Sequence, residues 1–166
     1  LWTLEDVKKK CARTFSTILR LMERYPEFHF VQSQPQLYQY TKENYPEVFE
    51  GIREKVNTGQ WEPVGGMWVE SDCNVPSGES LVRQVIMGKK FFRDEFDVDI
   101  KNLWLPDVFG YSAALPQILK KSGIDHFFTA KLAWNDVNKF PYNSFRWRGI
   151  DGTEIFSHLT FLQNLY

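Results

Sequence analysis

The chain has 166 residues, 43% of them apolar and 16% aromatic, which is typical of one globular domain and excludes disordered or low-complexity sequence. Lys and Arg total 20 against 21 Asp and Glu, so the net charge of −1 provides no positive field for nucleic acid or an anionic membrane. No apolar run approaches the roughly 20 residues that cross a bilayer, and the first residues lack a signal-peptide pattern. Two cysteines cannot build a cysteine-based metal site, and we expect a cytoplasmic protein.

Hydrophobic periodicity predicts alternating helices and strands along the whole chain. In chain order these are a helix from its N-cap Thr3 to just before Pro26, a buried strand at 28–31, a polar segment, a helix at 47–58, a bulged strand at 61–70, a helix after Gly78 with an inward face at 81–96, a buried strand at 102–105, a helix at 113–121, a strand at 124–129, and an antiparallel hairpin of 145–148 with 154–158. The strand–helix–strand order over 102–129 predicts an α/β fold with a parallel sheet or barrel, because such crossovers are right-handed.

Two residues with reactive side chains are interpreted as structural. Cys11 lies on the apolar stripe of the first helix, as expected of a buried small hydrophobic residue. His29 alternates with phenylalanines on a predicted strand, so a core or edge position is favoured over a ligand role.

Acidic residues follow two of the predicted strands. Asp107 comes after the strand at 102–105 with only Pro106 between them. Glu70 and Asp72 similarly follow Trp68 and Val69 of the strand predicted at 61–70. Because loops at the carboxyl ends of parallel strands converge on one crevice, these carboxylates are candidate site residues. The rigid surroundings suit Asp107 to be a nucleophile or a metal ligand, and an equal alternative is that it satisfies amides of its own turn or of the next helix.

Aromatic residues beside polar ones, at 134–136 and 142–143, are typical of a sugar-binding surface on which rings stack against pyranose faces. Core packing is the alternative for most aromatic residues. The sequence contains no phosphate-binding loop, dinucleotide fingerprint, zinc-protease helix or nucleophile elbow.

Four motifs occur in order: GGMWVE at 65–70, PSGES at 76–80, WLPDVFGYS at 104–112 and KLAWN at 131–135. Together they resemble the α-mannosidases of glycoside hydrolase family 38, and more closely the cytosolic and bacterial type. The likeness extends from Leu1 to about His158. The resemblance implies that 1–166 is part of an N-terminal catalytic β/α barrel domain, seven-stranded in the family and incomplete here. It also implies retaining hydrolysis of terminal α-D-mannosides with one zinc ion.

The same resemblance implies roles for individual residues. Asp107 matches the position of the family's nucleophile, which is also a zinc ligand. Lys131 matches a basic position beside the nucleophile, where a cation favours the ionised carboxylate and contributes to substrate binding. Asp72 is expected to reach the sugar or to orient a residue that does, and Trp134 is expected to bind the sugar.

The sequence departs from the family pattern in what it lacks. The family's His-x-Asp zinc pair precedes the place where this sequence opens, and its acid/base carboxylate and last zinc histidine lie beyond Tyr166. The three histidines present do not match the zinc motifs: they are His29, His126 and His158. This chain therefore supplies one of the two carboxylates that a retaining glycosidase needs, and we expect it to be inactive alone.

About five strands precede the hairpin, whereas a closed β/α barrel takes roughly 200–250 residues. We therefore expect an open sheet whose apolar surface is covered by the rest of a longer polypeptide, or by a second copy in a homo-oligomer. Two further functions stay open: a non-catalytic carbohydrate-binding module that uses Trp134 and Tyr142, and another metal-dependent carbohydrate-active barrel such as a deacetylase.

Overall fold

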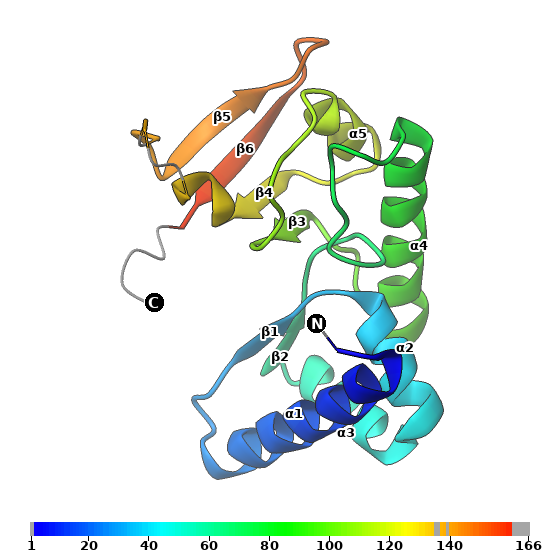
Figure 1. Ribbon diagram of the computed structural model, residues 1–166. Coiled ribbons are helices and arrows are strands. Elements are labelled where there is room, and N and C mark those ends of the chain that lie inside the picture. The colour runs from blue at the N-terminus through cyan, green and yellow to red at the C-terminus, as the bar shows by residue number, and fades with distance from the viewer. Residues whose placement is uncertain (1, 135–136, 139, 161–166) are drawn as a thin grey trace.

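The computed structural model describes residues 2–134, 137–138 and 140–160 (Figure 1). The helices and strands are, in chain order, α1 (Leu4–Arg24), β1 (Phe30–Gln32), α2 (Pro35–Asn44), α3 (Pro46–Asn57), β2 (Trp61–Pro63), α4 (Gly78–Phe96), β3 (Asn102–Leu105), α5 (Leu115–Lys121), β4 (His126–Thr129), the 3₁₀ turn η1 (Lys131–Ala133), β5 (Ser144–Arg148) and β6 (Glu154–Leu159).

The strands form two small sheets. β1 pairs in parallel with β2, and a four-stranded sheet has the order β3-β4-β6-β5. In that sheet β3, β4 and β6 are parallel, whereas β5 is antiparallel to β6 as predicted for the hairpin. Between the two sheets the amide of Gly65 donates to Oδ1 of Asn102 at 3.0 Å. The described residues thus form an open α/β arc with helices on its outer side, and no closed barrel is seen among them (Figure 1).

The first helix is defined by its cap and its apolar stripe. Thr3 and Asp6 form the capping box that the sequence predicts, and the helix buries Cys11, Phe15 and Met22. The interpretation of Cys11 as a buried structural residue is therefore confirmed.

Aromatic residues form the centre of the core. Nε1 of Trp61 donates to the hydroxyl of Tyr38 at 2.8 Å, and that hydroxyl donates to the carbonyl of Gln32 at 3.0 Å. Phe15 packs edge-on against Trp61, and Phe92 packs edge-on against Tyr38. Burial raises the pKa of Tyr38, so its phenol stays neutral. Core packing therefore explains much of the aromatic content.

One predicted strand is much shorter than expected. The strand predicted at 61–70 ends at Pro63, because Gly65 and Gly66 adopt positive φ angles and turn the chain off the ladder. The following residues, with Trp68 against Phe91 of α4, form a packed loop.

Burial of the strands is also less than expected. β1 is only partly buried, with Val31 39% exposed, and β3 buries Leu103 and Leu105 while its alternate residues remain partly exposed. The physical reason is the open arc: nothing among the described residues covers its inner face.

One helix was not predicted. The segment read as polar contains α2, which starts with Pro35 at its first turn, lacks a side-chain N-cap, and buries Tyr38 and Thr41. Its apolar stripe is too weak to show the helical period, and proline at the first helical position is the signal that indicates it.

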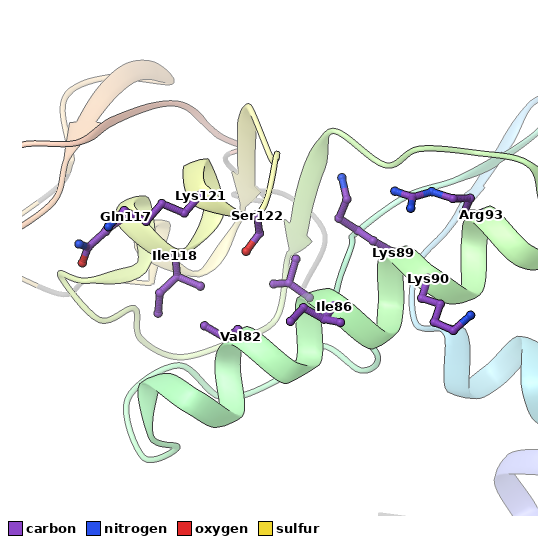
Figure 2. Close-up of a pocket in the computed structure, with 10 residues that line it drawn as sticks. Val82, Ile86, Lys89, Lys90, Arg93, Gln117, Ile118, Lys121 and Ser122 are labelled. Atoms are coloured by element: carbon purple, nitrogen blue, oxygen red, sulfur yellow. The ribbon is translucent and has the colours of Figure 1, made fainter.

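A groove of about 590 Å³ lies between α4 and α5 (Figure 2). Ile118 of α5 points toward Val82 and Ile86 of α4, and Lys90 and Lys121 lie at its rim. None of the candidate site residues lines this groove, so it is separate from the strand ends at which the site lies.

Candidate active site

The site is centred on a carboxylate and a lysine at the ends of neighbouring strands. Asp107 follows β3 and Lys131 follows β4, and these strands are parallel, so both residues emerge at the same edge of the sheet. The ammonium Nζ of Lys131 lies 2.7 Å from Oδ1 of Asp107. The lysine side chain is only 9% exposed, whereas the aspartate side chain is 75% exposed. The geometry thus presents a carboxylate to solvent with a fixed cation behind it.

Two aromatic rings enclose the ammonium group. Nζ of Lys131 lies 3.3 Å from the ring centre of Trp134 and 4.7 Å from that of Phe109, and the two rings meet edge to face at 6.2 Å. Cation–π attraction and the ion pair together fix the lysine. Trp134 is 58% exposed, so part of its surface is available to a ligand.

Tyr111 fixes the turn that carries Asp107. Its hydroxyl donates to the carbonyl of Val108 at 2.8 Å and contacts the hydroxyl of Thr129 at the end of β4. Burial raises the pKa of Tyr111 to about 12, so it remains a neutral hydrogen-bonding group. The turn after β3 is therefore tied to the end of β4.

Ser33 directly follows β1, and Glu70 lies in the loop after β2. The hydroxyl of Ser33, just after β1, donates to Oε1 of Glu70 at 2.6 Å. Burial raises the pKa of Glu70, the Ser33 hydrogen bond opposes this shift, and the negative charge of Asp107 adds to it. Sequence reasoning placed Glu70 in a motif and missed Ser33, since a single serine in a polar segment carries no signal.

Asp72 uses its carboxylate in its own turn. Oδ1 accepts hydrogen bonds from the amides of Asn74 and Val75, both at 2.8 Å, and these bonds hold the pKa of Asp72 below its ordinary value. The turn lies beside the site, because Cys73 forms a parallel bridge with Tyr111. Among the described residues Asp72 makes no contact with Asp107, and its role in binding the sugar stays a prediction.

The residues of this chain fit zinc only in part. The exposed carboxylate of Asp107 is a suitable oxygen ligand for the ion. However, the described parts of the chain contain no cluster of three or more His, Cys, Asp or Glu side chains that could hold a metal.

Two of the histidines make polar contacts outside the pair of Asp107 and Lys131. His29 is exposed at a strand edge, with Nδ1 3.2 Å from the carbonyl of Gly59, and His158 lies 2.9 Å from the hydroxyl of Ser144. The interpretation of His29 as an edge residue is consistent with this contact. Two polar neighbours of Trp134 that were predicted to bind the sugar, Asn135 and Asp136, lie outside the described residues.

The chain thus has an α/β fold with a lysine-paired carboxylate at the carboxyl ends of parallel strands, which is where α/β folds position their functional sites. The family model "Glycosyl hydrolases family 38 N-terminal domain" matches residues 1–166. The chain belongs to this family.

Curated relatives agree with this assignment. The chain is 55% identical to α-mannosidase G of Dictyostelium discoideum over 95% of its own length and 14% of that protein. It is 49% identical to α-mannosidase 2C1 of Homo sapiens, over 95% of this chain and 15% of the relative. It is 45% identical to an α-mannosidase of Saccharomyces cerevisiae, over 96% of this chain and 15% of that protein. The chain thus spans only a small part of the relatives it matches.

Solved structures show the same fold. An α-mannosidase from Enterococcus faecalis V583 superposes with a TM-score of 0.80 at 22% identity, over 95% of this chain and 18% of that one. A 4-α-glucanotransferase from Thermococcus litoralis superposes with a TM-score of 0.77 at 20% identity, over 97% of this chain and 26% of that one. At this identity the likeness concerns the fold alone.

None of the helices in the described part of the chain has the length and apolar character to cross a membrane. The expected cytoplasmic location stays a prediction.

Proposed function

We propose that the intact protein hydrolyses terminal α-D-mannosides with retention of configuration, and that Asp107 is the nucleophile. The observation that carries the proposal is the ion pair of the exposed Asp107 carboxylate with the buried Lys131 ammonium. The chain's membership of family 38 and its identity to curated α-mannosidases support the substrate class, and they favour a mannosidase over a binding module or a deacetylase.

Asp107 and Lys131 have different roles in the proposed reaction at the anomeric carbon. A carboxylate oxygen of Asp107 attacks that carbon and forms a covalent glycosyl intermediate, which water later hydrolyses. Lys131 orients the carboxylate through the ion pair, while Trp134 and Phe109 hold the ammonium in place. The carboxyl group that protonates the departing oxygen comes from another part of the protein in this proposal.

The proposal includes a zinc ion, for which this chain provides one ligand, Asp107. Its carboxylate is the one zinc ligand that we assign to this chain, and a bound zinc ion would supply Lewis-acid chemistry at the sugar hydroxyls. The remaining ligands, like the strands that complete a seven-stranded barrel, are proposed to come from the rest of the protein, since the chain covers 14–15% of its curated relatives.

The test uses the full-length protein with Asp107→Asn and an aryl α-mannoside. We expect kcat/KM to fall by at least about 10³-fold, because the amide oxygen is a poor nucleophile, and bound zinc to decrease. Asp94→Asn, on the exposed side of α4, is the control and should retain full activity. Activity of Asp107→Asn within tenfold of the parent contradicts the proposal.

A further inference from the structure

Ser33 and Glu70 form a polar pair that the proposed reaction does not use. Ser33 is 5% exposed, and its hydroxyl donates to Oε1 of Glu70 at 2.6 Å across 37 residues of chain. Neither residue caps a helix, since the N-cap position of α2 is Gln34 and that of α4 is Ser77. Two polar side chains are therefore brought together at the strand ends without a role in the secondary structure.

Packing fixes the chain on both sides of this pair. The amide of Val69, next to Glu70, donates to Oε1 of Gln84 on α4 at 3.0 Å. Gly65 lies against Ser33 so closely that a Cβ atom there would be 3.0 Å from the Cβ of the serine. The orientation of the Glu70 carboxyl group is thus set by α4, by the glycine turn and by Ser33.

The second carboxyl oxygen of Glu70 is not used in the fold. Among the described residues Oε2 makes no hydrogen bond, and it is not fully buried. Gly65 places the pair beside β3, the strand that Asp107 follows, because a Cβ atom at Gly65 would also lie 3.3 Å from the Cβ of Trp104. Burial raises the pKa of Glu70, and the negative charge of Asp107 adds to this shift, in agreement with that placement. A carboxyl group held by Ser33 through one oxygen, with its second oxygen not used in the fold, is suited to bind a polar ligand.

We propose that Glu70, oriented by Ser33, binds one hydroxyl group of the sugar ring that Asp107 attacks. The inference rests on the proposed function and adds a specificity-determining residue to it. An ionised Glu70 accepts a hydrogen bond from the hydroxyl and a protonated Glu70 donates one to it, so recognition does not require one protonation state.

The test compares 4-nitrophenyl α-mannoside with its 2-, 3-, 4- and 6-deoxy analogues in the full-length protein. For each analogue the ratio of kcat/KM values, intact over deoxy, measures what the missing hydroxyl contributes. We expect Glu70→Ala to reduce one of these ratios about 10- to 100-fold and to leave the other three unchanged. Ser33→Ala should reduce the same ratio by a smaller factor, and the exposed Glu47→Gln should change none.

Four unchanged ratios in Glu70→Ala, with activity lowered uniformly, overturn the inference and leave Glu70 a structural residue. If Glu70→Ala does not fold, Glu70→Gln tests the inference instead, because glutamine retains the shape of the side chain and the Ser33 contact. The inference then requires that one of the four ratios in Glu70→Gln differs from that of the parent by about threefold or more. A parent protein that hydrolyses no α-mannoside refutes the proposed function and this inference with it. An active parent with unchanged ratios refutes only the inference.

Discussion

Lys131 is almost fully buried at the point where its ammonium meets the exposed carboxylate of Asp107, 2.7 Å away. A buried lysine is costly without compensation, and here the carboxylate and two aromatic faces provide it. The arrangement holds the cation rigidly and leaves the aspartate open to a ligand, which is the asymmetry that an attacking carboxylate requires.

Removal of this cation tests its role. In the full-length protein Lys131→Met should lower kcat/KM about 10- to 100-fold, since a charge-assisted hydrogen bond to Asp107 is lost while the apolar stem remains. Lys131→Arg should recover part of the activity. Lys120→Met provides a matched control, because Lys120 forms a surface ion pair with Asp125 at 2.6 Å. Equal activities of Lys131→Met and Lys120→Met would show that the site pair has no function.

The aromatic partner of the lysine gives a second prediction. Trp134→Ala should lower kcat/KM about 3- to 30-fold through loss of the cation–π contact and of stacking surface, whereas Trp134→Phe should stay within about threefold of the parent. Trp2 forms a similar contact with Lys10 at 3.9 Å on the surface, so Trp2→Ala is the control. A Trp134→Ala protein with parental kinetics contradicts both the binding role and the positioning role.

The sequence predicted the centre of the site because its residues lie in continuous motifs beside strand ends. The pairing of Lys131 with Asp107 was expected from the resemblance to family 38, and the parallel pairing of β3 with β4 is its structural basis. Asp72 shows the limit of this reasoning, because position after a strand does not reveal that its carboxylate accepts bonds from its own turn. Ser33 was missed since its contact with Glu70 depends on how two loops pack, which no periodicity encodes.

The fold was predictable to a similar extent. Strong apolar stripes predicted α1 and α4, the N-cap Thr3 predicted the start of α1, and the two runs at 145–148 and 154–158 predicted the hairpin of β5 and β6. The lengths of β1 and β2 and the helix α2 were not predicted, because glycine conformation and tertiary packing decide them. The twin glycines after β2 indicated a bulged strand or a close backbone approach, and the second interpretation is correct, because the backbone of Gly66 lies directly against Gly88 of α4.

That close approach yields a stability prediction. A Cβ atom at Gly88 of α4 would overlap the carbonyl of Gly66 and the backbone of Met67. Gly88→Ala should therefore lower the free energy of unfolding by about 1–3 kcal/mol, although alanine favours a helix. Gly78→Ala is the matched control, because no atom lies within 4 Å of the added Cβ at the start of the same helix. Chemical denaturation of both variants measures the difference, and a stabilised Gly88→Ala would contradict this packing.

Asp99 gives a prediction that depends on pH. It lies between α4 and β3, where it forms ion pairs with Lys101 at 2.6 Å and with the largely buried Lys89 at 2.8 Å. Hydrogen bonds from Lys101 and Lys89 hold the pKa of Asp99 well below its ordinary value of 3.8. Because the pKa is lower in the folded state, the carboxylate stabilises the fold above the ordinary value, and this contribution is lost as the pH falls toward the folded-state pKa.

Asp99→Asn should therefore lower the thermal midpoint of the protein at pH 7, and the difference from the parent should shrink below about pH 4. The effect is expected to be small, since Asp99 is 45% exposed and solvent screens the pairs. Thermal unfolding of parent and variant at pH 7, 5 and 3 measures it, with the exposed Glu47→Gln as the control for general charge effects. A difference that grows toward acid pH would contradict the assignment, because it would require Asp99 to be stabilised by protonation.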